Sequence, residues 1–492
     1  MSPLRFPSAV ALLLALASPS LRADHIQSFQ KPENVLGQVQ FNAGGIGNPP
    51  TAANLYFPSA VAVDPTTGKV FISDTQNNRV LRFSSAAALT TGAAAEAVLG
   101  QPDFTSNGHA TTPKELYAPA GLAFDPTGRL WVADTKNHRV LRFDNASAKP
   151  QFAASADGVL GEPNFSTAVA TTPPTAASMN QPEGVAADAA GTLWVADAAN
   201  NRLLRFDNAV AKAAGANADG VLGAPTFTVN IGTVTAQYSV ARPFSLVMDA
   251  AGTLWVADTF NDRVLRFDNA NAKANGALAD GILGQPAYDA SVPTSPPTAK
   301  TMNFPAGVTL DSAGALWVAD SGNSRVLRFD NVTAKADDAA ADAVLGQKSF
   351  TENFTATTRA GMDRPESVAI SPSGDLFVVE VSNHRATRFT PTADPITPTP
   401  PATASAPTIA LAGKKSLRTS QAAITLKGTA ASANGIARVE YRIGHHGFKS
   451  AAGATAWHFT AKLQPGKNTI TIQAISNANL TSAPIVVRVT RN

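Results

Sequence analysis

Residues 130–143 read LWVADTKNHRVLRF, two short apolar runs joined by the polar segment DTKNH. Runs of this kind around a short polar segment are typical of a β-hairpin. Asp134, His138 and Arg139 lie within six positions of one another, so the segment could hold a catalytic or metal-binding cluster or could be part of a scaffold. The rest of the chain distinguishes these interpretations, because the segment recurs.

Six related segments are spaced at a regular interval along the chain. They are FISDTQNNRVLRF (71–83), WVADTKNHRVLRF (131–143), WVADAANNRLLRF (194–206), WVADTFNDRVLRF (255–267), WVADSGNSRVLRF (317–329) and FVVEVSNHRATRF (377–389). Their arginines stand 60 to 63 residues apart. A steady period of this size indicates an array of equivalent supersecondary units.

Each unit contains four strand-like runs, which in the second unit are residues 121–124, 130–133, 139–143 and 158–161. The first two are joined by DPTG, a tight-turn sequence with glycine placed for positive φ. A four-stranded sheet of this size cannot bury both faces alone, whereas sheets packed radially in a propeller can. An aromatic residue of each unit is then expected in the core between blades: Phe71, Trp131, Trp194, Trp255, Trp317 and Phe377.

The count of outer strands predicts how the ring closes. VLGQ-like runs occur six times, and the first, within residues 34–38, precedes the first repeat. The sixth repeat ends at Phe389 and runs into a proline-rich segment without a fourth strand of its own. We therefore expect residues 34–38 to supply the outer strand of the last of six blades, which leaves no open sheet edge.

The pattern P-x-G-V-A-x-D followed by G-x-L-W-V-A-D-x-x-N-x-R-V-L-R-F resembles the NHL repeat family, over about residues 33–392. The resemblance implies an all-β chain with a six-bladed NHL-type β-propeller. It implies no particular activity, because NHL propellers serve lyases, sensors, RNA binders and ubiquitin ligases. The ubiquitin ligases are excluded, since a RING domain needs cysteine ligands and the chain contains no cysteine.

An active site is usually unique, yet the acid and the arginine of the opening segment recur in all six units. We interpret them as a structural ion pair that fixes the hairpin between the second and third strands. The residue before the arginine varies, and at His138 we interpret it as a solvated part of the scaffold. The structural repeat residues are Asp74, Arg79, Asp134, Arg139, Asp197, Arg202, Asp258, Arg263, Asp320, Arg325, Glu380 and Arg385.

Binding groups are expected on one loop face of the propeller. The hairpins between second and third strands share that face with the connections to the next blade's inner strand, which are long here, and loops on a rigid scaffold concentrate binding groups. Their aromatic, amide and arginine side chains suit a sugar, a peptide or a polyanion, with ordinary exposed loops as the alternative. The candidate residues are Tyr56, Phe57, Gln76, Tyr117, Lys136, His138, Arg242, Phe260, Asp262, Phe304, Arg364 and His384.

The sequence assigns no catalytic residue. It has seven histidines but no HxH or HExxH motif, so we predict no metal site and no cofactor. A non-enzymatic role is therefore favoured over an enzymatic one. A metal-dependent lyase or lactonase with its site in the propeller channel remains the alternative.

The segments on either side of the propeller differ from it in composition. Residues 1–23 combine a positive charge, a short apolar run and a small-residue ending, which predicts an export signal peptide. The propeller is then expected over residues 24–392. Residues 393–405 are rich in Pro, Thr and Ala and predict a semi-extended linker.

Residues 406–492 predict a second, small domain. Their alternating strand-like runs favour an Ig-like or fibronectin-like β-sandwich. From residue 405 to the end there are eleven lysines and arginines and one acid, Glu440, for a net charge of about +10. Such a domain would be attracted to anionic polymers or lipid head groups; aiding solubility or docking on the acidic propeller is the alternative. The expected strands are 408–411, 422–428, 436–443, 457–463, 468–476 and 484–490.

Together these features predict an exported scaffold protein, secreted, periplasmic or associated with the cell envelope. The propeller's loop face would bind a glycan, a peptide or a protein, and the basic Ig-like domain would attach the protein to a surface, a matrix or an anionic envelope polymer. Export disfavours nucleic acid as a partner. No segment beyond residue 23 is long and apolar enough to be a transmembrane helix.

Overall fold

The structure, a computed structural model, falls into two compact units, one up to Ala393 and one from Asp394. The predicted signal peptide (1–23) and the predicted linker (393–405) lie outside the described residues. Within the described parts, no helix is both long and apolar enough to span a membrane. The structure describes residues 26–47, 49–232, 234–392, 406–432, 436–444, 446–476 and 481–492.

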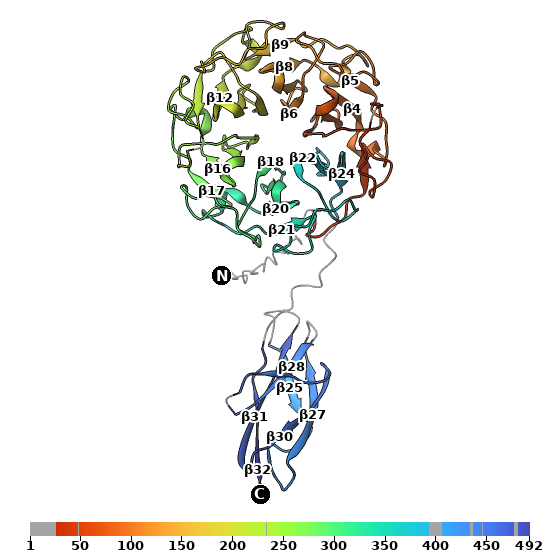
Figure 1. The fold of residues 1–492 in the computed structure, drawn as a ribbon, viewed down its shortest axis with the longest axis vertical. Coiled ribbons are helices and arrows are strands. Elements are labelled where there is room, and N and C mark those ends of the chain that lie inside the picture. Colours follow the sequence, from red (N-terminus) through yellow and green to blue (C-terminus); the bar gives the residue numbers. More distant parts are fainter. Residues whose placement is uncertain are drawn as a thin grey trace, which may run out of the picture. The chain divides into compact units, whose positions relative to one another are not determined.

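The first unit is an all-β propeller built from four-stranded antiparallel sheets, of which the described residues form six. Figure 1 shows the sheets as a ring, with β6, β18 and β22 toward the middle and β9, β17 and β21 at the rim. Blade 1 is β2 (Ala60–Val63), β3 (Lys69–Asp74), β4 (Arg79–Ser85) and β5 (Ala97–Leu99). Blade 2 is β6 (Pro119–Phe124), β7 (Leu130–Asp134), β8 (Arg139–Phe143) and β9 (Gly158–Leu160). Blade 3 is β10 (Pro182–Ala187), β11 (Leu193–Asp197), β12 (Arg202–Phe206) and β13 (Gly220–Leu222). Blade 4 is β14 (Ser245–Met248), β15 (Leu254–Asp258), β16 (Arg263–Phe267) and β17 (Gly281–Leu283). Blade 5 is β18 (Pro305–Leu310), β19 (Leu316–Asp320), β20 (Arg325–Phe329) and β21 (Ala343–Leu345).

Blade 6 is assembled from the two ends of the unit. Its strands β22 (Pro365–Ile370), β23 (Leu376–Glu380) and β24 (Arg385–Phe389) are followed in space by β1 (Asn34–Leu36). β1 pairs antiparallel with β24, with Asn34 opposite Arg388 and Leu36 opposite Ala386. The chain therefore closes the ring with backbone hydrogen bonds between its first and last propeller strands.

Short 3-10 helices occupy two connections in most blades, where the sequence pattern indicated only loops. Those in the hairpins between second and third strands are η1 (Thr75–Asn77), η3 (Thr135–Asn137), η5 (Ala198–Asn200), η7 (Thr259–Asn261) and η9 (Ser321–Asn323). Those after the third strand are η2 (Ala86–Ala88), η4 (Ala146–Ala148), η6 (Ala209–Ala211), η8 (Ala270–Ala272) and η10 (Val332–Ala334).

The hydrophobic core of the propeller lies between blades. Phe71 of blade 1 packs in one cluster with Leu130 and Val132 of blade 2, while Trp131 packs with Val195 of blade 3. The aromatic residue of each second strand is thus shared with the following blade, as the repeat predicts, and this continues around to Phe377, which packs with blade 1. Burying one such side chain contributes about 2 to 3 kcal/mol, so the ring is held by six comparable seams.

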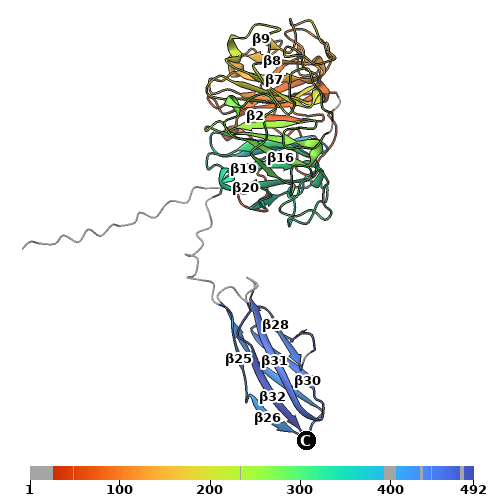
Figure 2. The ribbon, with the colours of Figure 1, turned by 90° about the vertical axis from the view of Figure 1, so that its left-hand side faces the viewer.

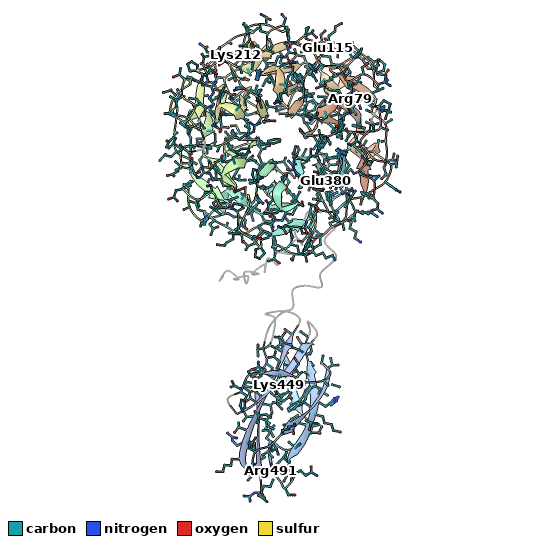
Figure 3. The ribbon with its side chains drawn as sticks, viewed as in Figure 1. Arg79, Glu115, Lys212, Glu380, Lys449 and Arg491 are labelled. Atoms are coloured by element: carbon teal, nitrogen blue, oxygen red, sulfur yellow. The ribbon has the colours of Figure 1, made fainter. Side chains whose placement is uncertain are left out.

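In each of the six blades, the hairpin between the second and third strands contains a buried ion pair. Arg79 Nε lies 2.7 Å from Asp74 Oδ2, and the five other pairs are 2.6 to 2.8 Å long. All twelve side chains are at most 1% exposed. Figure 3 labels two of these residues, Arg79 and Glu380, within the wall of the ring.

The arginine also joins the hairpin to two long connections. Arg79 Nη2 donates to the carbonyls of Thr51 (2.8 Å) and Asn54 (3.2 Å) before the blade, and Nη1 donates to that of Phe104 after it. The same pattern recurs in the other blades, as at Arg139. The cluster in the opening segment is therefore scaffold: one guanidinium fixes the hairpin and the loops on both sides of it.

A second repeated bond links the hairpin between the second and third strands to the next blade in five blades. His138 is half-buried, and its Nδ1 accepts a hydrogen bond from the backbone N–H of Gln181 at 3.1 Å. The interpretation of His138 as a solvated residue is thus wrong, because its left-handed backbone (φ 57°) turns the side chain toward blade 3. Corresponding bonds join Asn78 to Ala118, Asn201 to Arg242, Asp262 to Phe304 and His384 to Phe57.

The two histidines should make ring stability depend on acid. Burial lowers the pKa of both His138 and His384, and each must be neutral at Nδ1 to accept its bond. A depressed folded pKa means that their contribution is complete above about pH 6.5 and is lost as the pH falls through the folded pKa. In the wild type, acidification should lower the free energy of unfolding by about 1 kcal/mol for each of these bonds. Replacing both histidines by asparagine, the residue at this position in blades 1 and 3, should abolish that decrease.

Thermal melts of the wild-type and double-variant proteins between neutral and mildly acidic pH measure this effect as a difference between the two curves. Asn201→His is the matched reverse control and should add acid sensitivity. Parallel curves for all three proteins would show that these bonds do not depend on histidine charge.

The second unit is a pair of packed sheets. The three-stranded sheet is β25-β27-β30, and the five-stranded sheet is β26-β32-β31-β28-β29. Both contribute to one core around Trp457, Val439 and Val487, and Figure 2 shows β28, β31 and β32 side by side. The sequence did not indicate β26, which runs parallel to β32, or β29. The strands are β25 (Thr408–Leu411), β26 (Ser416–Thr419), β27 (Ala423–Ala431), β28 (Ile436–Ile443), β29 (Lys449–Ser450), β30 (Ala456–Lys462), β31 (Gly466–Ser476) and β32 (Ile485–Arg491).

Candidate ligand-binding site

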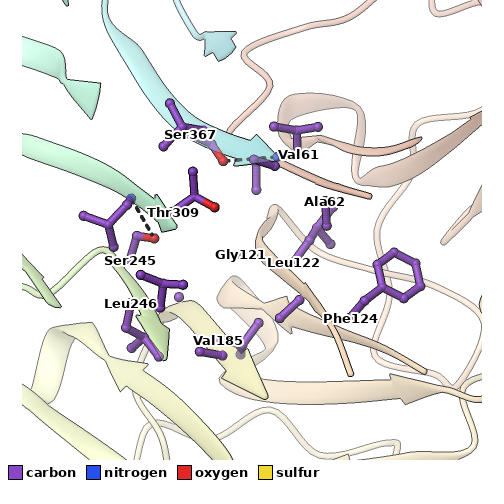
Figure 4. Close-up of a pocket in the computed structure, with 18 of the residues that line it drawn as sticks. Val61, Ala62, Gly121, Leu122, Phe124, Val185, Ser245, Leu246, Thr309 and Ser367 are labelled. Atoms are coloured by element: carbon purple, nitrogen blue, oxygen red, sulfur yellow. Dashed lines mark hydrogen bonds between the residues drawn. The ribbon is translucent and has the colours of Figure 1, made fainter. Parts of the chain in front are cut away.

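The first strands of the six blades line the central channel. They approach one another closely because small residues follow the strand-initiating proline: a Cβ on Gly121 would lie 2.2 Å from the carbonyl oxygen of Glu183. The channel contains a cavity of about 250 Å³. Figure 4 shows hydroxyls used within its wall, where Ser367 accepts from the Val61 N–H at 3.2 Å and Ser245 from the Val308 N–H at 3.4 Å.

The repeat is broken at the mouth of this channel. The residue directly after the inner-strand proline is small in three blades, but it is Glu183 in blade 3, Phe244 in blade 4 and Glu366 in blade 6. The two glutamate side chains are only 10% and 12% exposed. Both line the channel cavity, so two carboxyl groups three blades apart face the same space.

Both glutamates are weakened as acids by their surroundings. Burial raises the pKa of Glu183 to about 7, although the Arg242 guanidinium, 3.3 Å away, opposes the rise. Burial also raises the pKa of Glu366 to about 7, opposed by Arg364 at 3.6 Å, while the charge of Glu183 raises it further. Each group therefore changes charge near neutral pH and could exchange a proton or donate a hydrogen bond from its protonated form.

A larger pocket of about 550 Å³ lies on the loop face and adjoins the channel cavity at Phe244 and Glu366, which line both spaces. Phe260 and Phe304 stand edge to face on its wall, with ring centroids 5.6 Å apart and an interplanar angle of 78°. Their side chains are 48% and 46% exposed. Arg242 and Arg364 also line this pocket, which we call the mouth pocket.

The blade 5 hairpin presents small residues to the mouth pocket. Ser321 and Gly322 line the pocket, and the position of Gly322 is held by Lys136 in blade 2 and Phe260 in blade 4. A Cβ at Gly322 would lie 2.7 Å from Cγ of Asn303, so the close packing there requires glycine. The mouth pocket therefore lies over the loops of blades 4 to 6.

The structure brings together four of the twelve candidate binding residues: Arg242, Phe260, Phe304 and Arg364 all line the mouth pocket. The other eight lie elsewhere on the loop face or serve the scaffold. Tyr56, Phe57 and His384 form an aromatic cluster at the joint between blades 6 and 1; Tyr117 stacks on His109 at 3.8 Å; Gln76 and Lys136 are exposed; and His138 and Asp262 make the bonds between blades described above.

Sequence reasoning missed Glu183, Phe244 and Glu366. A break in the repeat is the signal that could have revealed them. The position directly after the inner-strand proline holds a small residue in the other three blades. In a symmetric scaffold the residues that differ between units are those free to serve a single site. Glu183 and Glu366 lie at the starts of inner strands and Phe244 directly precedes one, whereas binding groups were expected in the loops.

The residues of the channel and pocket do not form an evident metal centre. Among the residues that the structure describes, no group of three or more His, Asp or Glu side chains is arranged to hold a metal ion. The carboxylates at the mouth are instead placed beside arginines.

The comparisons with known proteins agree with this architecture. The NHL repeat family model matches residues 116–143, 179–206 and 302–329, which fall in blades 2, 3 and 5. The chain thus contains NHL repeats at these three positions, on a β-propeller. No curated protein sequence matches the chain.

Solved structures similar to the chain are all at low identity. A streptogramin B lyase is 12% identical (70% of this chain, 95% of the other; TM-score 0.39). A catalytically inactive virginiamycin B lyase from Staphylococcus aureus with quinupristin is 14% identical (85% and 97%; TM-score 0.39). Hydrazine synthase of Kuenenia stuttgartiensis is 14% identical (71% and 100%; TM-score 0.42). Similarity at this level does not transfer an activity.

Proposed function

We propose that this protein is an exported scaffold whose propeller binds a ligand or partner at the loop face, while the basic second unit attaches it to a surface or matrix. The mouth pocket is the observation that carries the binding role. It is large enough for a small molecule or for a side chain of a peptide, and it presents apolar rings beside a few polar groups, the composition usual for ligand sites. The rest of the loop face is available to a larger partner.

Attachment by the second unit is supported by the distribution of its charge. Ten of its eleven lysines and arginines are exposed. Among the residues of this unit that the structure describes, one ion pair forms, between Arg438 and Glu440 at 2.6 Å. Arg418, Arg442 and Arg488 lie on the five-stranded sheet and are exposed. Cations that lack acidic neighbours attract a polyanion in a salt-dependent way. An anionic envelope polymer or matrix is the partner that this charge favours.

One observation favours a second candidate function. Glu183 and Glu366, with pKa values of about 7, could serve as a general acid and a general base in the channel, which fits a lyase or lactonase. In that case the mouth pocket would lead the substrate to the glutamates. A metal would be expected only if further ligands assembled on substrate binding.

A screen with two readouts tests these proposals. Purified full-length protein is first assayed for bound metal, and its melting temperature is compared in EDTA, calcium and zinc. Oligosaccharides, peptides and organic acids are then screened for stabilisation of the wild type, Phe260→Ser and Glu183→Gln/Glu366→Gln proteins. Binding lost with Phe260→Ser and not accompanied by turnover supports the scaffold. A stoichiometric metal would contradict the scaffold proposal and support the enzymatic one. Product formation that is lost in the Glu183→Gln/Glu366→Gln variant would do the same.

A further inference from the structure

We infer that the mouth pocket selects a small organic anion with an apolar ring, such as an aromatic carboxylate. The inference rests on the proposed binding function and specifies its ligand. It follows from the two kinds of side chain that the pocket juxtaposes.

The apolar half of the pocket is made by phenylalanine. Phe260 and Phe304 leave about half of their surface exposed, and Phe244 lies deeper, at the junction with the channel. Single exposed apolar side chains need no explanation, but a perpendicular pair on the wall of a hollow forms an apolar corner. A planar ring can stack on one phenylalanine of this corner while its edge contacts the other, whereas a fully hydroxylated sugar would leave its hydroxyls without partners there.

The charged half is made by arginine. The side chain of Arg364 is 59% exposed, and its ion-pair partner Glu366 is 3.6 Å away. Arg242 Nη2 makes only long contacts, 3.4 Å to Gln181 and 3.3 Å to Glu183. Both guanidiniums therefore retain donors, and their planar arrangement of N–H groups suits a carboxylate.

The acids that face these arginines do not cancel their charge in mildly acidic solution. They are Asp363, Glu366 and Glu183, and burial raises the pKa of each. Lys136, which lies near Glu183, adds a further positive charge. When Glu183 and Glu366 are protonated, the positive charges of the two arginines are opposed by Asp363 alone. The net charge at the pocket is then positive and favours an anionic ligand over a cationic one. The volume of about 550 Å³ limits the ligand to small-molecule size.

Calorimetric titration of the full-length protein at about pH 6 with 2-naphthoate and with the neutral 2-naphthamide tests the inference. The naphthoate should bind about tenfold more tightly than the amide, a difference of about one charge-assisted hydrogen bond. Arg364→Gln should remove that preference while leaving the amide unchanged, and Phe260→Ser should weaken both. Lys136→Gln, at the hairpin position equivalent to Phe260 but outside the pocket, is the matched control and should weaken the naphthoate less than Arg364→Gln does.

The possible failures are distinguishable. Equal affinity for the acid and the amide, or a preference that survives Arg364→Gln, would overturn the inference about charge. If neither probe bound while another class of compound bound in a manner abolished by Phe260→Ser, the ligand class would be wrong and the pocket correct. If no compound responded to Phe260→Ser, the proposed binding function would fail as well.

Discussion

Replacing Arg263 by methionine is expected to lower the free energy of unfolding of the propeller by about 3 to 5 kcal/mol. The substitution leaves the fully buried Asp258 without its partner at 2.6 Å. Burial already raises the pKa of Asp258, and the Arg263 guanidinium is the main opposing influence. Carbonyls of Ala236 and Ser239 lose their donor in the same step.

Denaturant titration followed by tryptophan fluorescence measures the loss, because four of the five tryptophans lie between blades. Arg139→Met should cost a similar amount, since the same bonds recur in blade 2. Arg266→Met is the matched control on the same strand; its partner Asp268 is 45% exposed, so the loss should stay near or below about 1 kcal/mol. A small loss at Arg263, or an equal loss at Arg266, would contradict a scaffold role for the buried pairs.

Replacing Glu366 by glutamine is expected to stabilise the protein by up to about 3 kcal/mol at mildly alkaline pH. The folded pKa of Glu366 is raised from 4.5 to about 7, so the folded state holds its proton more tightly than the unfolded state. Stability from this group is therefore present below about pH 4.5 and declines as the pH rises to about 7. Glutamine keeps the shape of the side chain without the buried charge.

Melting curves across that pH range separate this effect from the others. The difference between the Glu366→Gln variant and the wild type should grow from acidic to neutral pH and then level off. Glu183→Gln should behave in the same way, and Glu352→Gln, which lies outside the channel, should not. A constant difference would show that the pKa of Glu366 is close to its ordinary value, and one that grows toward acid would show that this pKa is lowered; either result would contradict the prediction.

Much of the propeller is readable from the chain because its structure repeats. Alternation of apolar residues predicts the strands, and the period of 60 to 63 residues separates the blades. The sixth repeat lacks a fourth strand, and the strand expected at residues 34–38 has no repeat of its own, so each needs the other. The pairing of β1 with β24 joins them in the structure. The recurrence of Asp and Arg indicates scaffold, since a single site needs no six copies.

The binding site was only partly predictable. The loop face contributes Arg242, Phe260, Phe304 and Arg364, all expected from the sequence, but the pocket is also lined by Glu366 of the inner strand β22 and by Phe244, directly before β14. Eight further candidates lie on the same face and outside the pocket, because sequence position specifies the face of the ring and not the sector. The His138 bond to Gln181 was also hidden, since it depends on a left-handed backbone and on a neighbouring blade.

The sequence by itself determined the repeating unit, its strands, the ring closure and the buried pairs, because these follow from local pattern and are repeated enough to be recognised. Only the tertiary structure decided which departures from the repeat meet. Arg242, Phe304 and Arg364 belong to three different blades, and curvature of the ring brings them around one hollow above the small blade 5 hairpin. Burial of Glu183 and Glu366, and with it their raised pKa values, likewise arises from inner strands converging on the channel.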